Sequence, residues 1–152
     1  MIKNKYLELK KKYNLPDYNE LNLLFDLEDI SEDSDLILQR IRIKIYEKIG
    51  FYSELFENIL QPESSLADLY EAHYIDDNTK NSAYSIYKKL IKILRKSNLV
   101  SLNNTEENNA TFINETMREF NLLKTEIEKH LKRRINLWEK ETNITEDLNY
   151  FG

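Results

Sequence analysis

The chain of 152 residues contains no cysteine and only two glycines and two prolines. The absence of cysteine excludes disulfides, thiolate metal sites and cysteine nucleophiles. Two glycines are too few for a glycine-rich phosphate loop, and no serine stands in the G-x-S-x-G pattern of a nucleophile elbow. The chain has a single valine as well as few glycines and prolines, and the composition favours helices because strand-rich proteins need turn residues and β-branched strand residues.

Long apolar runs are also missing. The N-terminal sequence MIKNKYLELKKKYN alternates lysine with single apolar residues and lacks the apolar core of a signal peptide. No stretch reaches the length of a transmembrane helix. We therefore expect a cytoplasmic protein that does not associate with membranes. Asparagine, isoleucine, lysine and tyrosine are abundant, and their A/T-rich codons indicate an A/T-rich source genome.

Apolar residues recur at helical spacing along most of the chain. Short helices are predicted within residues 1–30, and long helices over 33–61, 78–99 and 108–141. The polar segment 101–109 is predicted to be a linker. The third long helix has the clearest period, and its predicted buried positions are Phe112, Ile113, Met117, Phe120, Leu123, Ile127, Leu131, Ile135 and Trp138.

Several residues mark where these helices begin, end or bend. Asp17 is a predicted N-cap, with Glu20 in capping-box spacing, and Ser65 is a predicted N-cap of a further short helix. Pro62 is predicted to end the first long helix. Gly50, in the middle of that helix, is interpreted as a place of close helix contact or a slight kink.

These elements predict an all-α fold for a single domain of residues 1–152. Short connections make neighbouring helices antiparallel. We expect an antiparallel bundle of three long helices, with two or three short helices packed alongside. Residues 144–152 carry Ile144, Leu148, Tyr150 and Phe151. So apolar a segment is predicted to dock on the bundle, with Leu148 and Phe151 buried, or to be buried in a partner.

Charges are sorted into blocks. Residues 13–39 and 49–79 carry acidic side chains but no lysine or arginine, whereas residues 80–105 carry lysine and arginine but no acidic side chain. The favoured interpretation is that acidic and basic helices lie side by side. The alternative is a surface on the second and third long helices that contacts nucleic acid or an acidic partner. Its residues would be Lys88, Lys92, Arg95, Lys96, Lys129, Lys132 and Arg133.

Candidates for chemistry are few. Glu54 and Glu57 share a helix face and could hold a metal or act as an acid–base pair. Glu71 and His73 lie in the acidic segment 62–77, which is the first place to look for a site. No histidine follows a glutamate by three residues, as a di-iron bundle requires. We expect His130 on a solvated face, His73 at the edge of the core, and no catalytic, cofactor-binding or metal-binding residue.

The sequence therefore predicts a non-enzymatic helical module that acts in protein interaction or as a structural element, without a cofactor. Its partner would be another protein or a second copy of the chain. Nucleic-acid binding through the basic residues is the alternative function, and the net charge of −5 argues against it.

Overall fold

The computed structural model describes residues 2–31, 35–63 and 65–141, and these ranges contain helices and no strands. The predicted all-α fold is confirmed. Residues 144–152, which the sequence predicts to dock on the bundle, lie outside the described residues. The helices are α1 (Ile2–Tyr13), α2 (Tyr18–Phe25), the 3-10 turn η1 (Leu27–Asp29), α3 (Ile37–Leu60), α4 (Leu66–Tyr74), α5 (Asp77–Leu102) and α6 (Glu106–Leu137).

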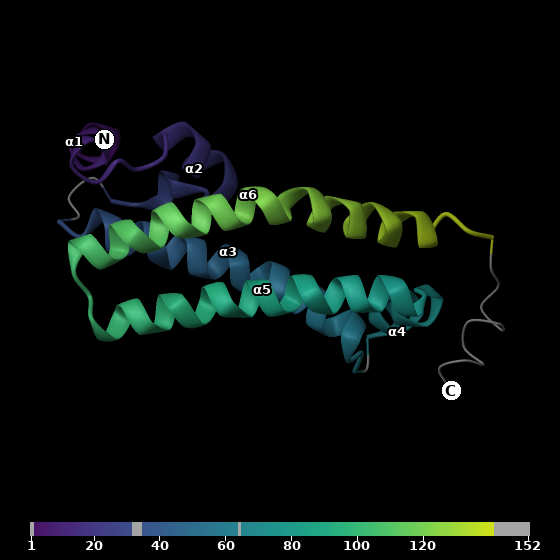
Figure 1. Ribbon diagram of the computed structural model, residues 1–152. Coiled ribbons are helices and arrows are strands. Elements are labelled where there is room, and N and C mark those ends of the chain that lie inside the picture. The colour runs from purple at the N-terminus through teal and green to yellow at the C-terminus, as the bar shows by residue number, and fades with distance from the viewer. Residues whose placement is uncertain (1, 32–34, 64, 142–152) are drawn as a thin grey trace.

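The long helices α3, α5 and α6 pack against one another along their length (Figure 1). Helix α5 runs antiparallel to α3, and α6 runs antiparallel to α5, so α3 and α6 point the same way. Helices α1 and α2 lie against α6 and α3 at the end of the bundle where α6 begins. Helix α4 contacts α3 and α6 at the opposite end. The predicted bundle with short helices alongside is confirmed.

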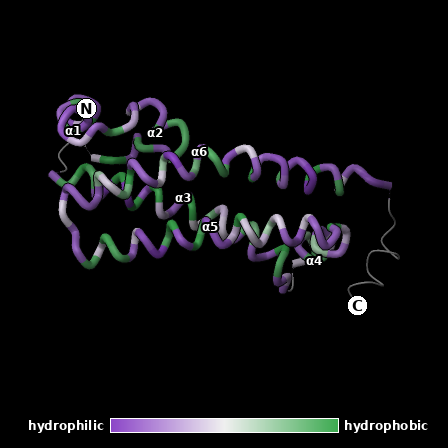
Figure 2. The backbone as a smooth tube through the Cα atoms, viewed as in Figure 1, coloured by the Kyte–Doolittle hydropathy of each residue, from purple (hydrophilic) through white to green (hydrophobic). Residues whose placement is uncertain are grey.

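The core follows the apolar period of the long helices. Figure 2 shows that apolar residues recur at intervals along each helix and do not form long runs. In α3, Tyr52 is half-buried, and the other members of the apolar row at helical spacing are buried: Leu38, Ile41, Ile45, Ile49, Phe56 and Ile59. An aromatic contact joins the short helix α2 to this core. The ring centroid of Phe25 in α2 lies 5.4 Å from that of Phe120 in α6. The apolar stripes thus bring α2, α3 and α6 together.

Side-chain caps fix three of the helix starts. Ser65 accepts a hydrogen bond from the backbone N–H of Asp68, as predicted. Asp76 and Thr105 cap α5 and α6 in the same way. Asp17 occupies the N-cap position of α2, but its side chain makes no capping bond and pairs with Lys10 of α1 instead.

Several boundaries differ from the prediction, and one of them is the end of α6, which lies at Leu137 and not at residue 141. The segment 101–109 is not a linker, because only residues 103–105 separate α5 from α6. Its asparagines and glutamates suit the first turn of α6, where free N–H groups favour oxygen acceptors. Helix α3 begins at Ile37 and not at residue 33. Before it, Leu27 and Ile30 are buried, so this part of the chain packs η1 onto the bundle.

The C-terminal part of α6 buries a different face from the predicted one. Ile135 and Trp138 are 60% and 51% exposed, whereas His130, Arg134 and Leu137 are buried. Both sets fit helical spacing. The polar set is buried because neighbouring helices satisfy it: Ser82 of α5 meets His130, and Glu71 of α4 meets Arg134. The prediction of a solvated His130 and buried Ile135 and Trp138 is wrong.

Gly50 is not a point of close helix contact. It lies within the continuous helix α3, and a Cβ placed there would meet no atom within 4 Å outside its immediate surroundings. Ser53 donates a hydrogen bond to the Gly50 carbonyl at 2.8 Å. The open space beside Gly50 therefore leaves room for a side chain. None of the described helices is both long enough and apolar enough to cross a membrane.

Candidate functional site

One of the predicted basic residues of α5, Lys96, lies next to carboxylates of α6. Lys88, Lys92 and Arg95 are exposed, and Lys96 is half-buried. The ammonium group of Lys96 lies 3.1 Å from a carboxylate oxygen of Glu119 and 3.8 Å from one of Glu115. Part of the positive charge of α5 is therefore compensated within the bundle.

The predicted basic residues of α6 also have partners. Lys129 pairs with Glu126 at 3.8 Å and Lys132 with Glu128 at 3.2 Å. Arg133 donates a hydrogen bond to the hydroxyl of Thr79 in α5 at 3.2 Å. Lys132, unlike Arg133, borders a groove beside α3. Lys132 and Arg133 therefore face different neighbours.

The acidic candidates do not converge either. Glu54 is exposed on α3, and Glu57 accepts a hydrogen bond from the Tyr87 hydroxyl at 2.8 Å. Glu71 is buried in α4, while His73 of the same helix is exposed and not at the edge of the core. Within the described part of the chain, no three histidine or carboxylate side chains are arranged to hold a metal ion.

Glu71 belongs to a buried cluster that joins α4 to the end of α6. One of its carboxylate oxygens accepts the Nε–H of Arg134, and the other accepts the indole N–H of Trp138 at 3.1 Å. Arg134 also donates to the backbone carbonyl of Leu55 at 2.9 Å. The Tyr70 ring stacks on Trp138 at 4.2 Å between centroids. This cluster contributes to stability and holds no open site.

Ser82 and His130 form a hydrogen bond, with 3.0 Å between the hydroxyl oxygen and Nε2. Such a pair is a nucleophile with its base in many hydrolases. Here the imidazole is 3% exposed and packs edge-on against Phe56. Burial first, and the charge of Arg133 second, lower the pKa of His130. A ring so enclosed cannot meet a substrate, so the pair supports packing.

A second buried polar cluster surrounds Arg42 of α3, which is 6% exposed. Its Nε–H donates to the side-chain oxygen of Asn109 at 2.8 Å, and Nη1 donates to the hydroxyl of Ser97 at 2.9 Å. All of these partners are neutral, and burial lowers the pKa of Arg42. The cluster connects all three long helices near the turn between α5 and α6.

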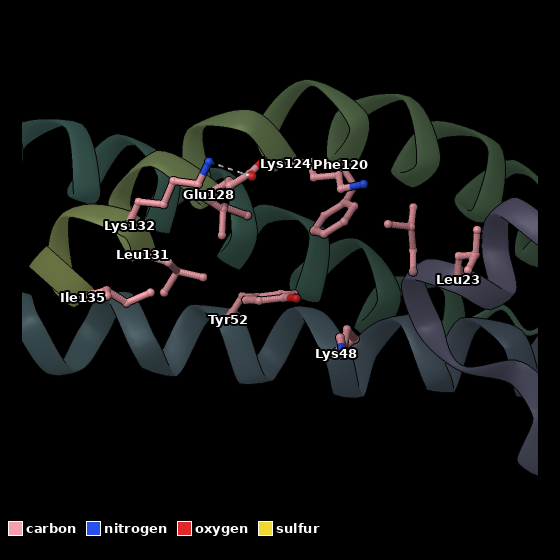
Figure 3. A pocket seen from close by; sticks show the side chains of 11 residues that line it. Leu23, Lys48, Tyr52, Phe120, Lys124, Glu128, Leu131, Lys132 and Ile135 are labelled. Carbon is pink, nitrogen blue, oxygen red and sulfur yellow. Dashed lines mark ion pairs between the residues drawn. The ribbon is translucent and has the colours of Figure 1, made fainter.

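A concave feature with a volume of about 580 Å³ lies between α2, α3 and α6 (Figure 3). We call it the α2–α3–α6 groove. Its base is formed by the buried side chains of Phe120 and Ile127 and the half-buried Tyr52 and Leu131. Its edges carry Leu23 and Ile135, which are 86% and 60% exposed. The complete set of lining residues is Leu23, Leu24, Lys48, Tyr52, Phe120, Lys124, Ile127, Glu128, Leu131, Lys132 and Ile135.

Positive charge borders this groove. Lys48, Lys124 and Lys132 line it, against a single carboxylate, that of Glu128. Figure 3 shows Glu128 paired with Lys132, while Lys48 and Lys124 lie farther along. The ammonium group of Lys48 lies 5.8 Å from the centre of the Tyr52 ring, which it can approach as a cation–π partner. The groove therefore combines an apolar base with a basic border.

Sequence reasoning identified Lys132 but missed the groove. One signal was present in α6, where Leu131, Ile135 and Trp138 form an apolar row beside the row that holds His130 and Arg134. A helix with more apolar positions than one bundle face can bury offers a second contact surface. Comparison of the chain with family models, curated proteins and solved structures gives no match.

Proposed function

We propose that this chain is a protein-interaction module whose α2–α3–α6 groove binds an amphipathic segment that carries acidic residues. The observation that carries this proposal is the combination of an apolar groove of about 580 Å³ with exposed leucine and isoleucine edges and a lysine border. Helical proteins commonly bind amphipathic helices in grooves of this kind, through apolar anchors at helical spacing.

The energetic terms favour such a partner. Each large apolar side chain that a partner buries in the groove contributes roughly 1.5–3 kcal/mol. Leu23 and Ile135 would lose their exposed area in the same step. Carboxylates of the partner would meet Lys48 and Lys124, which steers association and selects against basic segments. The partner is a second protein or a second copy of the chain, and light scattering at low and high salt distinguishes these two cases.

Binding is better supported than catalysis because the polar groups that chemistry would need are either enclosed or dispersed. His130 and Ser82 pack in the interior, and Glu71 is held by Arg134 and Trp138. Nucleic-acid binding is the less supported alternative, since carboxylates of α6 stand beside Lys96, Lys129 and Lys132. Retardation of RNA at low salt that is lost in K88E/K92E/R95E would favour that alternative.

The proposal is tested by selecting peptides from a displayed library against the intact chain. We expect binders with apolar residues at positions i, i+3 or i+4, and i+7, together with Asp or Glu. Leu23→Glu with Ile135→Glu should weaken them at least about tenfold. Leu99→Glu with Leu122→Glu is the matched control, because both leucines are comparably exposed on α5 and α6 away from the groove. Binders that the groove variant leaves unaffected would contradict the proposal.

A further inference from the structure

We infer that the α2–α3–α6 groove binds the chain's own C-terminal segment, residues 144–151, which then competes with any protein partner. This inference rests on the proposed function, because it takes the same groove as the binding site. The groove is a continuation of contacts that already exist. Helix α2 covers α3 and α6 as far as Leu23 and Leu24, and beyond these residues the same two helices remain open up to Ile135 (Figure 3).

The position and length of the segment fit the groove. Helix α6 ends at Leu137, within one turn of Ile135, which lines the groove at its α4 end. From Ile135 back to Phe120, the groove extends along fifteen residues of α6, or about 22 Å. An extended segment of ten residues reaches about 33 Å. Residues 142–151 can therefore run the length of the groove in the direction opposite to α6.

The chemistry of the segment complements that of the groove. Ile144, Leu148, Tyr150 and Phe151 supply large apolar side chains, and two adjacent carboxylates, Glu146 and Asp147, lie among them. The groove offers an apolar base and the ammonium groups of Lys48 and Lys124. Basic residues are absent from 141–152, so no charge of the segment opposes those lysines.

Attachment to the same chain gives this segment an advantage over a free partner. A covalently tethered ligand acts at an effective concentration on the order of millimolar when its linker reaches the site. A free partner segment can bind the groove only if its affinity and concentration are high enough to displace the tethered segment. Loss of the anchors Leu148 and Phe151 should therefore strengthen the binding of groove-selected peptides.

The test uses the absence of cysteine, which allows a single engineered pair in the full chain. Leu23→Cys with Gly152→Cys should form an intrachain disulfide under mild oxidation at least about tenfold faster than Leu122→Cys with Gly152→Cys. Leu122 is a matched control because it is also highly exposed, at 79%. It follows Phe120 by two residues in α6, at the end of the groove where Leu23 lies, but it borders a different hollow with Lys89 and Lys92.

A second pair of variants tests the anchors. L148S/F151S, added to the L23C/G152C chain, should reduce the rate to that of the Leu122 control, whereas T145S/N149S should leave it unchanged. Equal rates for the Leu23 and Leu122 pairs, or a product that is mainly a disulfide-linked dimer, would overturn the inference. Neither result would affect the peptide selection, so failure of this inference is distinct from failure of the proposed function.

Discussion

Gly50 occupies an interior position of α3 without a structural need for glycine. It has an ordinary helical backbone, and open space surrounds the position of a Cβ. Gly50→Ala should raise the free energy of unfolding by about 0.5–1 kcal/mol, because glycine loses more backbone entropy on helix formation than alanine. Urea denaturation measures the change. A decrease would mean that the position has a constraint beyond its own helix.

Asn109 holds the side chain of Arg42 in the interior. Asn109→Leu keeps a similar volume but removes the acceptor of the Arg42 Nε–H. A buried donor on a charged group is then unsatisfied, so the free energy of unfolding should fall by about 1–3 kcal/mol or more. R42M/N109L should recover part of this loss, since it removes the unpaired charge as well. Equal stability of N109L and the original chain in urea would contradict this account.

His130 should make stability depend on pH. Its pKa is lowered in the folded chain, mainly by burial, whereas in the unfolded chain it takes its ordinary value near 6.5. As pH falls below about 6.5, the unfolded chain binds a proton that the folded chain does not, so the free energy of unfolding decreases. Urea denaturation between pH 5 and pH 8 should show this decrease.

Two variants separate the histidines in that experiment. His130→Gln should flatten the dependence on pH between 5 and 8, and His73→Gln, at the exposed histidine of α4, should retain it. An unchanged slope in H130Q would show that another group causes the dependence.

At the scale of elements, the buried pair of Glu71 and Arg134 is one of the contacts that hold α4 to α6. Arg134→Met leaves the Glu71 carboxylate buried without its cation and should lower the free energy of unfolding by about 3 kcal/mol or more. Arg133→Met, at the exposed neighbour, is the matched control and should change stability by less than about 0.5 kcal/mol. Chemical denaturation of both variants gives the comparison. Similar losses would mean that the buried pair does not stabilise the chain more than the exposed arginine does.

The helices themselves could be predicted from the sequence because apolar spacing and caps are local signals. Ser65 capped α4 as expected, and the core of α3 matched its apolar row. The extent of α5 and α6 could not be predicted as well, since the asparagines of 101–109 suit a linker and a helix start equally. Which row of α6 is buried depended on Glu71 and Ser82, which are distant in sequence from their partners.

The groove escaped prediction for a related reason. Its lining comes from α2, α3 and α6, and no single helix shows it. The sequence of α2 alone does not show that Leu23 borders a groove, because its 86% exposure depends on how α2 packs on the bundle. Lys132 and Arg133 are adjacent in α6, so their side chains point about 100° apart around the helix, and the packing of α6 decides which neighbour each one faces.

At the scale of the whole molecule, the segment after α6 should contribute to stability. Shortening the chain after Thr142 removes Leu148 and Phe151, whose burial would each contribute roughly 1.5–3 kcal/mol before the entropy of ordering is subtracted. The melting temperature should therefore fall, or oligomers should dissociate if the segment binds a second copy. Calorimetry and light scattering measure both. If neither changes, residues 144–151 do not bind to folded protein.

The two buried polar clusters lie near opposite ends of the long helices, with Arg42 at the turn between α5 and α6, and Arg134 near the end of α6. Because α3 starts where α6 starts and both point the same way, a tensile load applied between α1 and the end of α6 pulls the bundle along its axis. Helix α6 would then have to slide past its neighbours. Both clusters would resist that displacement together. After α1 and α2 detach, forced extension should therefore meet one high mechanical barrier, and that barrier sets the rate of forced unfolding.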